Sequence, residues 1–487
     1  MADAKAVIER AAADDAAGLG RLVEWLKIPS VSTDPAFRDE TRRAAEWCRD
    51  RLIECGVQAE LRETGAPDAP GHPIVWAEHE GSPDYAGPHV LFYGHYDVQP
   101  PDPLDLWESP PFEPVVRPAP EPGPGQSAAD VPGERIVARG AVDDKGQVAT
   151  FLEALRAWHA VHGGPPPVKM TIMIEGEEES GSVNLERFVK EQSPRLETCD
   201  VCVISDTGML ARGEPAVTYG VRGLAYTEVV LHAADQDLHS GMWGGRCPNP
   251  ISELTKVLAG LWDADRRVTI PGFYDDVVEP SAAERRAWAE LPLDYPGMLA
   301  KIGVPPEGDV GEAGFTAMER EWARPACDVN GIWGGYQGAG AKTVIPSYAG
   351  AKVSFRLVAN QDPARIAASF RAWLEERTPP GCRWEFHDHG GGHPGNVSTE
   401  SPYLQAAERA LATAAGGKKP HLIKTGGSIP VVGMLKSELN LDTLLVGFGL
   451  DDDRVHSPNE KFELECYRLG VRTHAALLAE WIGMGSS

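Results

Sequence analysis

Short apolar runs that alternate with helical patterns constrain the fold of this chain more than any other feature of its sequence. The runs are rich in β-branched residues, as buried strands are, and lie at residues 74–78, 89–93, 168–174 and 201–205. Helical patterns lie before and between them. This alternation is typical of a parallel sheet covered on both faces. We therefore predict an α/β fold with a mostly parallel sheet flanked by helices.

The length of 487 residues predicts two domains, because a single core rarely grows so large. The texture changes near residue 214, where two strand-helix-strand units predict a compact α+β domain inserted into the first. We place the first domain at residues 1–215 and 392–487, and the inserted domain at 216–391. Residues 118–133, which are rich in Pro, Gly and Ala, predict an exposed loop.

The formal net charge of -26 argues against a nucleic-acid partner, because phosphate binding requires a basic surface. No apolar run approaches 18 residues, so we expect no membrane span. The first residues lack the basic start and apolar run of a secretory signal. The eight cysteines are scattered and do not suggest a disulfide framework, so we expect a cytoplasmic protein.

The pair Cys199-x-x-Cys202 has the spacing of a redox or zinc motif. However, it lies beside the apolar run 201–204, and no second cysteine pair accompanies it. We interpret both thiols as packing residues of a strand.

Acids and one imidazole follow four successive predicted strands, at the point where each strand ends. They are His95 after the run 89–93, Asp143 after a short β-prone run at 135–138, Glu178 with Glu179 after 168–174, and Asp206 after 201–205. Ligands collect at the carboxyl edge of such a sheet. One imidazole with several carboxylates and no thiolate suits a hydrolytic Zn²⁺ or Mn²⁺ site, and so many ligands suit two ions that share a carboxylate.

Each of these motifs also has a purely structural interpretation. Asp143 or Asp144 could cap the helix that follows, and the acidic run 175–182 could be a solvated loop. The combination of four motifs in order favours the metal site.

Two further groups contain histidine. His456 follows a predicted strand at 443–446 in the returning part of the first domain, which makes it the candidate for a second imidazole. The rival cluster of His387, Asp388, His389 and His393 lies among glycines, without a predicted strand or helix face. We interpret that cluster as the link between the two domains.

Together these residues resemble the dinuclear metallopeptidase family that includes carnosine dipeptidases, glutamate carboxypeptidase, aminoacylase and succinyl-diaminopimelate desuccinylase. The resemblance extends from Gly94 to Glu460 and is greatest for the carnosinase-type branch. Lys424-Thr425 departs from the Arg-Glu that several relatives of that branch carry. The motifs occur in the family's order: Gly94-His95-x-Asp97, Asp143-Asp144-Lys145-Gly146, Glu178-Glu179-Ser180-Gly181-Ser182, Ser205-Asp206, His239-Ser240-Gly241 and Val455-His456-Ser457.

The resemblance implies two divalent ions per subunit, Zn²⁺ or Mn²⁺, with Co²⁺ also suitable. Asp143 would bridge them, His95 and Asp206 would complete one site, and Glu179 and His456 would complete the other. It also implies a cis peptide between Asp143 and Asp144. Asp97 would orient His95, and Glu178 would be the general base.

The resemblance further implies a homodimer in which the inserted domain serves as a lid and dimerisation domain. His239 would stabilise the oxyanion in the partner subunit's site. Arg356, with Thr343, Gly427 and Ser428, would hold the free carboxylate of the substrate.

The expected activity is that of a metal-dependent dipeptidase acting on dipeptides with a free C-terminal carboxylate. An alternative on the same scaffold is an amidohydrolase that removes an acyl group from an amino acid. A remote alternative is an inactive scaffold subunit. The presence of all five metal ligands and Glu178 argues against an inactive copy, which we would expect to have lost at least one.

Overall fold

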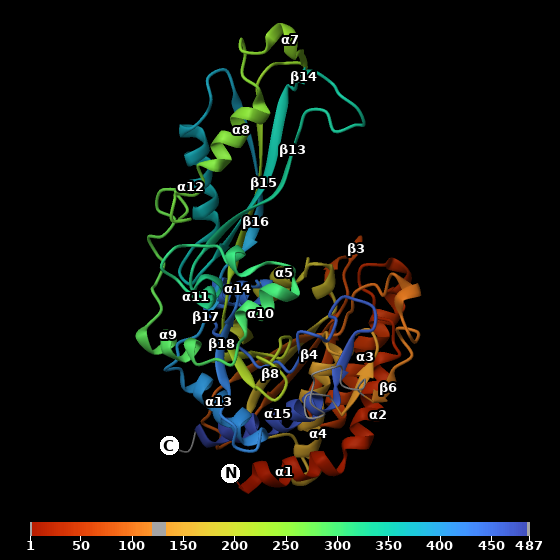
Figure 1. Ribbon diagram of the computed structural model, residues 1–487. Helices are drawn as coiled ribbons and strands as arrows, with labels where there is room; N and C mark the ends of the chain where they lie inside the picture. Colours follow the sequence, from red (N-terminus) through yellow and green to blue (C-terminus); the bar gives the residue numbers. More distant parts are fainter. Residues whose placement is uncertain (1, 119–132, 485–487) are drawn as a thin grey trace. The chain divides into compact units, whose positions relative to one another are not determined.

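A computed structural model describes residues 2–118 and 133–484 of the chain, which form two compact units (Figure 1). The first comprises Met1–Tyr219, Val397–Ile423 and Glu438–Ser487, and the second comprises Gly220–Asn396 and Lys424–Ser437. The first boundary between the units follows residue 219 where we predicted 215, and the second follows residue 396 where we predicted 391. The return of residues 424–437 to the second unit had no signal in the sequence. The predicted loop at 118–133 lies, but for its end residues, outside the described residues.

The first unit contains a largely parallel sheet, which confirms the predicted α/β fold. Strands β8, β5, β9 and β19 run parallel to one another, β4 and β10 pair antiparallel with β8 and β19, and β1 pairs antiparallel with β4. In spatial order the strands are β1 (Gln58–Arg62), β4 (Ile74–Glu80), β8 (Lys169–Glu175), β5 (Val90–His95), β9 (Val201–Ile204), β19 (Thr443–Leu445) and β10 (Ala216–Val221).

Helices of the first unit cover this sheet. Helix α4 packs against β5, and α3 packs against β1 and β4. The ring of Phe151 on α4 stacks on that of Phe92 on β5, with 3.8 Å between centroids. The helices are α1 (Ala2–Ala13), α2 (Asp15–Leu26), α3 (Arg38–Glu54), α4 (Lys145–His162), α5 (Leu185–Glu191), α6 (Ser193–Leu196), α13 (Pro402–Ala414) and α15 (Leu464–Met484).

The strand before Asp143 belongs to a different sheet from the one predicted. Strand β7 (Glu134–Val137) pairs with β6 (Val115–Pro118) and β20 (Lys461–Glu463), so only three of the four predicted strand ends belong to the main sheet. The reason is the antiparallel pairing of β7 with β20, a strand remote in sequence. A hairpin pair, β2 (Gly65–Ala66) and β3 (Ala69–Pro70), completes the strands of this unit.

The second unit is built on an antiparallel sheet, in the order β13 (Ala326–Gly334), β15 (Tyr348–Leu357), β11 (Gly223–His232) and β16 (Arg383–Gly392). Helices α8 (Pro250–Ala259) and α12 (Pro363–Glu376) pack against it (Figure 1). Its core includes Phe355, Phe370 and Trp373. The remaining elements are β12 (Leu238–His239), β14 (Val344–Ile345), β17 (Gly395–Asn396), α7 (Ser240–Trp243), α9 (Ala282–Ala289), α10 (Tyr295–Lys301) and α11 (Ala317–Trp322).

Residues 424–437, which belong to the second unit, begin within one strand and end within one helix. These are β18 (His421–Thr425) and α14 (Pro430–Leu439). In the described parts of the chain, every helix is too short or too polar to span a bilayer.

Candidate metal centre

Two groups of three side chains lie close enough to hold metal ions, and they share Asp143. One group is His95, Asp143 and Asp206, and the other is Asp143, Glu179 and His456. Within each group the potential ligand atoms lie within 4.8 Å of one another. These are the five residues that the resemblance implied as ligands, and they all belong to the first unit.

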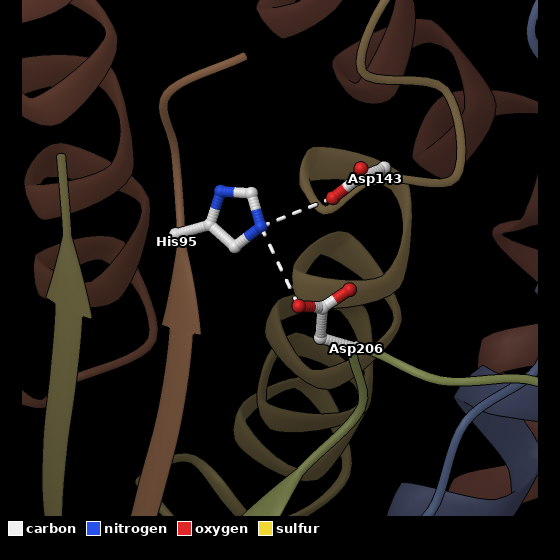
Figure 2. A group of neighbouring side chains, drawn as sticks. All are labelled: His95, Asp143 and Asp206. Atoms are coloured by element: carbon white, nitrogen blue, oxygen red, sulfur yellow. Dashed lines mark hydrogen bonds and ion pairs between the residues drawn. The ribbon is translucent and has the colours of Figure 1, made fainter. Parts of the chain in front are cut away.

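The first group forms where β5 and β9 end beside the loop that enters α4. His95 is the last residue of β5, and Asp206 follows β9. The Nε2 atom of His95 lies 3.1 Å from Asp143 Oδ1 and 3.6 Å from Asp206 Oδ2. Figure 2 shows both carboxylates directed at this one nitrogen. An ion could therefore contact all three side chains at once.

The second group uses the other oxygen of Asp143. His456 Nε2 lies 2.8 Å from Asp143 Oδ2 and 3.2 Å from Glu179 Oε2. Gln99 donates a hydrogen bond of 2.7 Å to Glu179 Oε2. His456 has a left-handed backbone with φ 59°, a conformation that non-glycine residues adopt rarely and often at functional sites.

The charges of this cluster favour a bound cation. Hydrogen bonds to Asp143 and Glu179 raise the pKa of His456 to about 10. Burial alone would lower the pKa of His95, but its hydrogen bonds to Asp143, Asp206 and Asp97 outweigh burial and raise that pKa well above its usual value. Both imidazoles are thus surrounded by enough negative charge to hold a proton. Imidazole and carboxylate donors suit divalent Zn²⁺ or Mn²⁺, so the residues present fit the implied metals.

Asp97 connects His95 to the acidic pair. It is fully buried, and its Oδ1 lies 3.4 Å from His95 Nδ1. The same carboxylate accepts the backbone N–H groups of Glu178 and Glu179, at 3.3 and 3.0 Å. One side chain therefore sets the orientation of an imidazole and the position of the loop that carries two acids. The arrangement is the one expected of a residue that orients a metal-binding histidine.

Glu178 lies next to the cluster but in neither group. Burial, together with the negative charges of Asp206, Glu179 and Asp97, raises its pKa to about 7, although His95 opposes the shift. A carboxyl group with this pKa can accept and return a proton near neutral pH.

Glu460 was missed in the sequence, although it supports the shared ligand. Its Oε1 accepts the N–H groups of Val142 and Asp143, at 3.0 and 3.1 Å. Its Oε2 accepts Gly140 N–H at 3.1 Å and Arg139 Nη1 at 2.7 Å. Both partners of the ion pair are buried. This carboxylate therefore fixes the backbone of the loop that carries Asp143.

The rest of the Asp143-Asp144-Lys145-Gly146 motif is structural. The Asp143–Asp144 peptide is cis, as the resemblance implied, and Asp144 Oδ2 accepts the backbone N–H of His95. The buried Lys145 donates to the carbonyls of Trp25 and Ile28, at 3.3 and 2.7 Å, and so caps the end of α2. A Cβ at Gly146 would lie 1.8 Å from Ala141 O, so only glycine fits there.

The predicted carboxylate-binding residues divide into two groups in the second unit. Arg356, near the end of β15, donates from Nη1 to Ser428 Oγ at 2.7 Å, and Gly427 lies beside Ser428 in the same turn. Thr343 does not join them. Its carbonyl accepts Ser240 N–H at 3.1 Å, which places it beside His239.

The strand β15 explains why Thr343 and Arg356 are separate. Thr343 precedes the first residue of β15, Tyr348, by five positions, whereas Arg356 is the next-to-last residue of that strand. Eight residues of strand span roughly 27 Å at about 3.3 Å per residue. Within one chain, the prediction that Thr343 and Arg356 act together is therefore wrong.

Three of the four residues of the rival histidine cluster lie in a strand, contrary to our prediction, and His393 follows that strand. Strand β16 continues through Gly392 and contains His387, Asp388 and His389. Its length reflects pairing with β11, which continues to Gly392 after a register shift. Within residues 2–118 and 133–484, the two groups that share Asp143 are the only sets with metal-ligand geometry, and they include neither these histidines nor Cys199 and Cys202.

Comparison with known proteins identifies a peptidase family and relatives that are named as dipeptidases. The sequence profile described as peptidase family M20/M25/M40 matches residues 91–480. The Cys-Gly metallodipeptidase DUG1 of Candida albicans is 31% identical over 473 residues, which are 93% of this chain and 92% of the relative. The human Beta-Ala-His dipeptidase is 31% identical over 471 residues, which are 94% and 89% of the two chains.

Solved structures agree with these sequence matches. The M20 family metallo-carboxypeptidase Sso-CP2 from Sulfolobus solfataricus is 30% identical and superposes with a TM-score of 0.75. The match covers 96% of this chain and 99% of that one. The profile match, residues 91–480, spans parts of both units and contains the positions of all five residues of the two groups.

Proposed function

Since this chain belongs to peptidase family M20/M25/M40 and is a metallopeptidase, we propose that it hydrolyses the peptide bond of dipeptides with a free C-terminal carboxylate. The observation that carries the proposal is the pair of three-residue groups that share Asp143, with Glu178 beside them. Two of the relatives are named for dipeptide substrates, Cys-Gly and Beta-Ala-His. We take both dipeptides as first candidates.

The proposed cofactor is a pair of divalent ions, Zn²⁺ or Mn²⁺. His95 and Asp206 would hold one, Glu179 and His456 the other, and Asp143 would contact both. When bound, such ions supply positive charge that polarises the scissile carbonyl and lowers the pKa of an attacking water. Gln99 supports Glu179 through a hydrogen bond, and Asp97 supports His95, whose Nδ1 lies 3.1 Å from the Asp97 backbone carbonyl and 3.4 Å from its carboxylate.

Glu178 is the proposed general base and acid. Its pKa of about 7, raised chiefly by burial, suits a group that takes a proton from water and returns it to the leaving amine. Its backbone is fixed by the bond to Asp97, so the carboxyl group starts from a defined position. Removal of this carboxylate should therefore reduce kcat more than it changes KM.

Substrate recognition is proposed to use both groups of the second unit. Arg356, supported by Ser428 and Gly427, would bind the free carboxylate through its bidentate guanidinium. His239 would stabilise the oxyanion in the site of a partner subunit. Because Thr343 lies beside His239, we assign Thr343 to the partner's site as well. The active assembly is then a homodimer.

All eight cysteines are free thiols. A protein without disulfides suits a reducing compartment, which supports the cytoplasm as the place of action.

The test is hydrolysis of a substrate panel by purified protein loaded with Zn²⁺ or with Mn²⁺. The panel contains Cys-Gly, Beta-Ala-His and a set of other dipeptides, each also as its C-terminal amide, together with N-acyl amino acids. We expect cleavage of free dipeptides, and at least tenfold slower cleavage of the amides, because about 1.4 kcal/mol of lost carboxylate binding is a factor of ten.

Glu178→Gln should lower kcat by roughly 10²–10⁴-fold, the usual contribution of a general base. The matched control is Glu186→Gln, which changes an exposed acid paired with Lys190 at 2.5 Å. Cleavage confined to N-acyl amino acids would replace the proposal with the amidohydrolase alternative. No metal-dependent turnover on any compound would leave the scaffold alternative.

A further inference from the structure

The turn formed by residues 425–428 presents Ser428 to Arg356 in the second unit. Thr425 Oγ1 accepts Gly427 N–H at 3.2 Å, which closes the turn, and Ser428 Oγ accepts Arg356 Nη1 at 2.7 Å. The turn contains two consecutive glycines, so its backbone has little intrinsic preference for one conformation. A contact from outside is needed to hold Ser428 in a fixed place.

Arg222, between β10 and β11, provides that contact twice. Its backbone N–H donates to Gly427 O at 3.2 Å, and its side-chain Nε donates to Gly426 O at 2.9 Å. The side chain lies directly over the turn, because a Cβ added to Gly426 would be 2.8 Å from Arg222 Nη2. Glycine at position 426 therefore permits the guanidinium to cross the turn.

The charge of Arg222 is not explained by an ion pair. Within the described part of the chain, no carboxylate forms a salt bridge with it, and the side chain is partly buried. Burial lowers its pKa, the negative charge of Glu321 raises it, and the positive charge of Arg356 lowers it. The two guanidinium groups both bond to residues of one turn, Arg222 to Gly426 and Arg356 to Ser428.

We propose that Arg222 is a positioning residue for binding of the substrate's free carboxylate. By holding the carbonyls of Gly426 and Gly427, it fixes the turn so that Ser428 Oγ orients the Arg356 guanidinium. The inference rests on the proposed function, because it concerns the same carboxylate. It assigns to Arg222 a role in distinguishing a free acid from its amide, through the geometry of Arg356 and without direct contact with the reacting atoms.

The experiment measures kcat and KM for the dipeptide that the wild-type protein cleaves fastest and for its C-terminal amide. Arg222→Gln removes the guanidinium, and Arg222→Lys keeps the charge. Gly426→Ala leaves the arginine in the chain but adds a methyl group 2.8 Å from both Arg222 Nη2 and Glu321 Cγ, which crowds the guanidinium. The matched control is Arg377→Gln. Arg377 lies in the same unit and also donates to a backbone carbonyl, that of Trp373 at 3.1 Å.

We expect Arg222→Gln to raise KM for the free dipeptide by about tenfold, the effect of one hydrogen bond to a charged group, with kcat changed far less. KM for the amide should stay near its wild-type value, so the preference for the acid falls. Gly426→Ala should reduce the same preference, Arg222→Lys should restore part of it, and Arg377→Gln should leave it unchanged.

Two results would overturn the inference alone. One is that Arg222→Gln and Gly426→Ala both keep the wild-type preference for the free dipeptide over its amide. The other is an equal loss of activity on acid and amide in both variants, which indicates a general structural role. If the wild-type protein cleaves no dipeptide, the proposed function fails, and this inference fails with it.

Discussion

Glu460→Gln tests whether the loop that carries Asp143 depends on a remote carboxylate. The Glu460 carboxylate accepts four hydrogen bonds, two at each oxygen. A glutamine places an NH₂ group where one oxygen was, so two N–H donors then face a donor. If the NH₂ group replaces Oε2, one of those donors is Arg139 Nη1. In either orientation the buried guanidinium of Arg139 loses its counter-charge.

The expected cost follows from these contacts. Removal of one partner from a buried ion pair costs about 3–5 kcal/mol, because the other charge stays buried and unpaired. This loss is large compared with the roughly 5–15 kcal/mol by which most domains are stable. Since Asp143 N–H is one of the donors, we also expect weaker metal binding at both groups of ligands.

The assay is equilibrium unfolding in urea of the metal-free protein, with metal affinity measured separately. The matched control is Glu480→Gln, since Glu480 pairs with Arg409 at 2.7 Å in a more exposed position, where an ion pair contributes about 1 kcal/mol or less. A loss below about 1 kcal/mol in Glu460→Gln, with unchanged metal affinity, would refute the reasoning.

Three further predictions concern pH, a supporting hydrogen bond and metal removal. Burial lowers the pKa of His474 to about 3, so the folded protein keeps it neutral while the unfolded chain binds a proton below about pH 6.5. As the pH falls from 6.5 to 4, the free energy of unfolding in urea should decrease by roughly 1.4 kcal/mol per pH unit more in the wild type than in His474→Asn. Equal pH dependence of the two proteins would contradict this. Gln99→Ala should weaken binding of one metal ion by about 10–100-fold, as measured by competition with a chelating dye, and unchanged affinity would show that the bond to Glu179 is dispensable. EDTA should abolish turnover and lower the midpoint of thermal unfolding, both restored by Zn²⁺ or Mn²⁺, because a ligand that binds only the folded state stabilises it.

The ligand residues could be predicted from the sequence because their signals are local. His95 and Asp206 lie at or just after apolar strands, and the sheet brings such positions to one edge. Asp143 was found by the same reasoning, although its strand belongs to another sheet. The residue could be singled out because the motif around Asp143 is distinctive, whatever its strand pairs with.

Other features depend on contacts between segments far apart in the chain, for which one sequence carries no pattern. Glu460 lies 317 residues from Asp143, and its role appears only when both loops are in place. Arg222 contacts the turn at Gly426 across 204 residues. Thr343 was grouped with Arg356 because the resemblance implied it, and the length of β15 separates the two residues within one chain.

A metal count tests whether two metal ions share Asp143. Protein saturated with Zn²⁺ and then freed of excess is analysed by inductively coupled plasma mass spectrometry, beside Asp206→Asn and Asp143→Asn. We expect two ions per chain in the wild type, about one in Asp206→Asn, and the greatest loss in Asp143→Asn, because only Asp143 belongs to both groups of candidate ligands. A wild-type protein that binds one ion or none, or an Asp143→Asn variant that keeps two, would contradict this expectation.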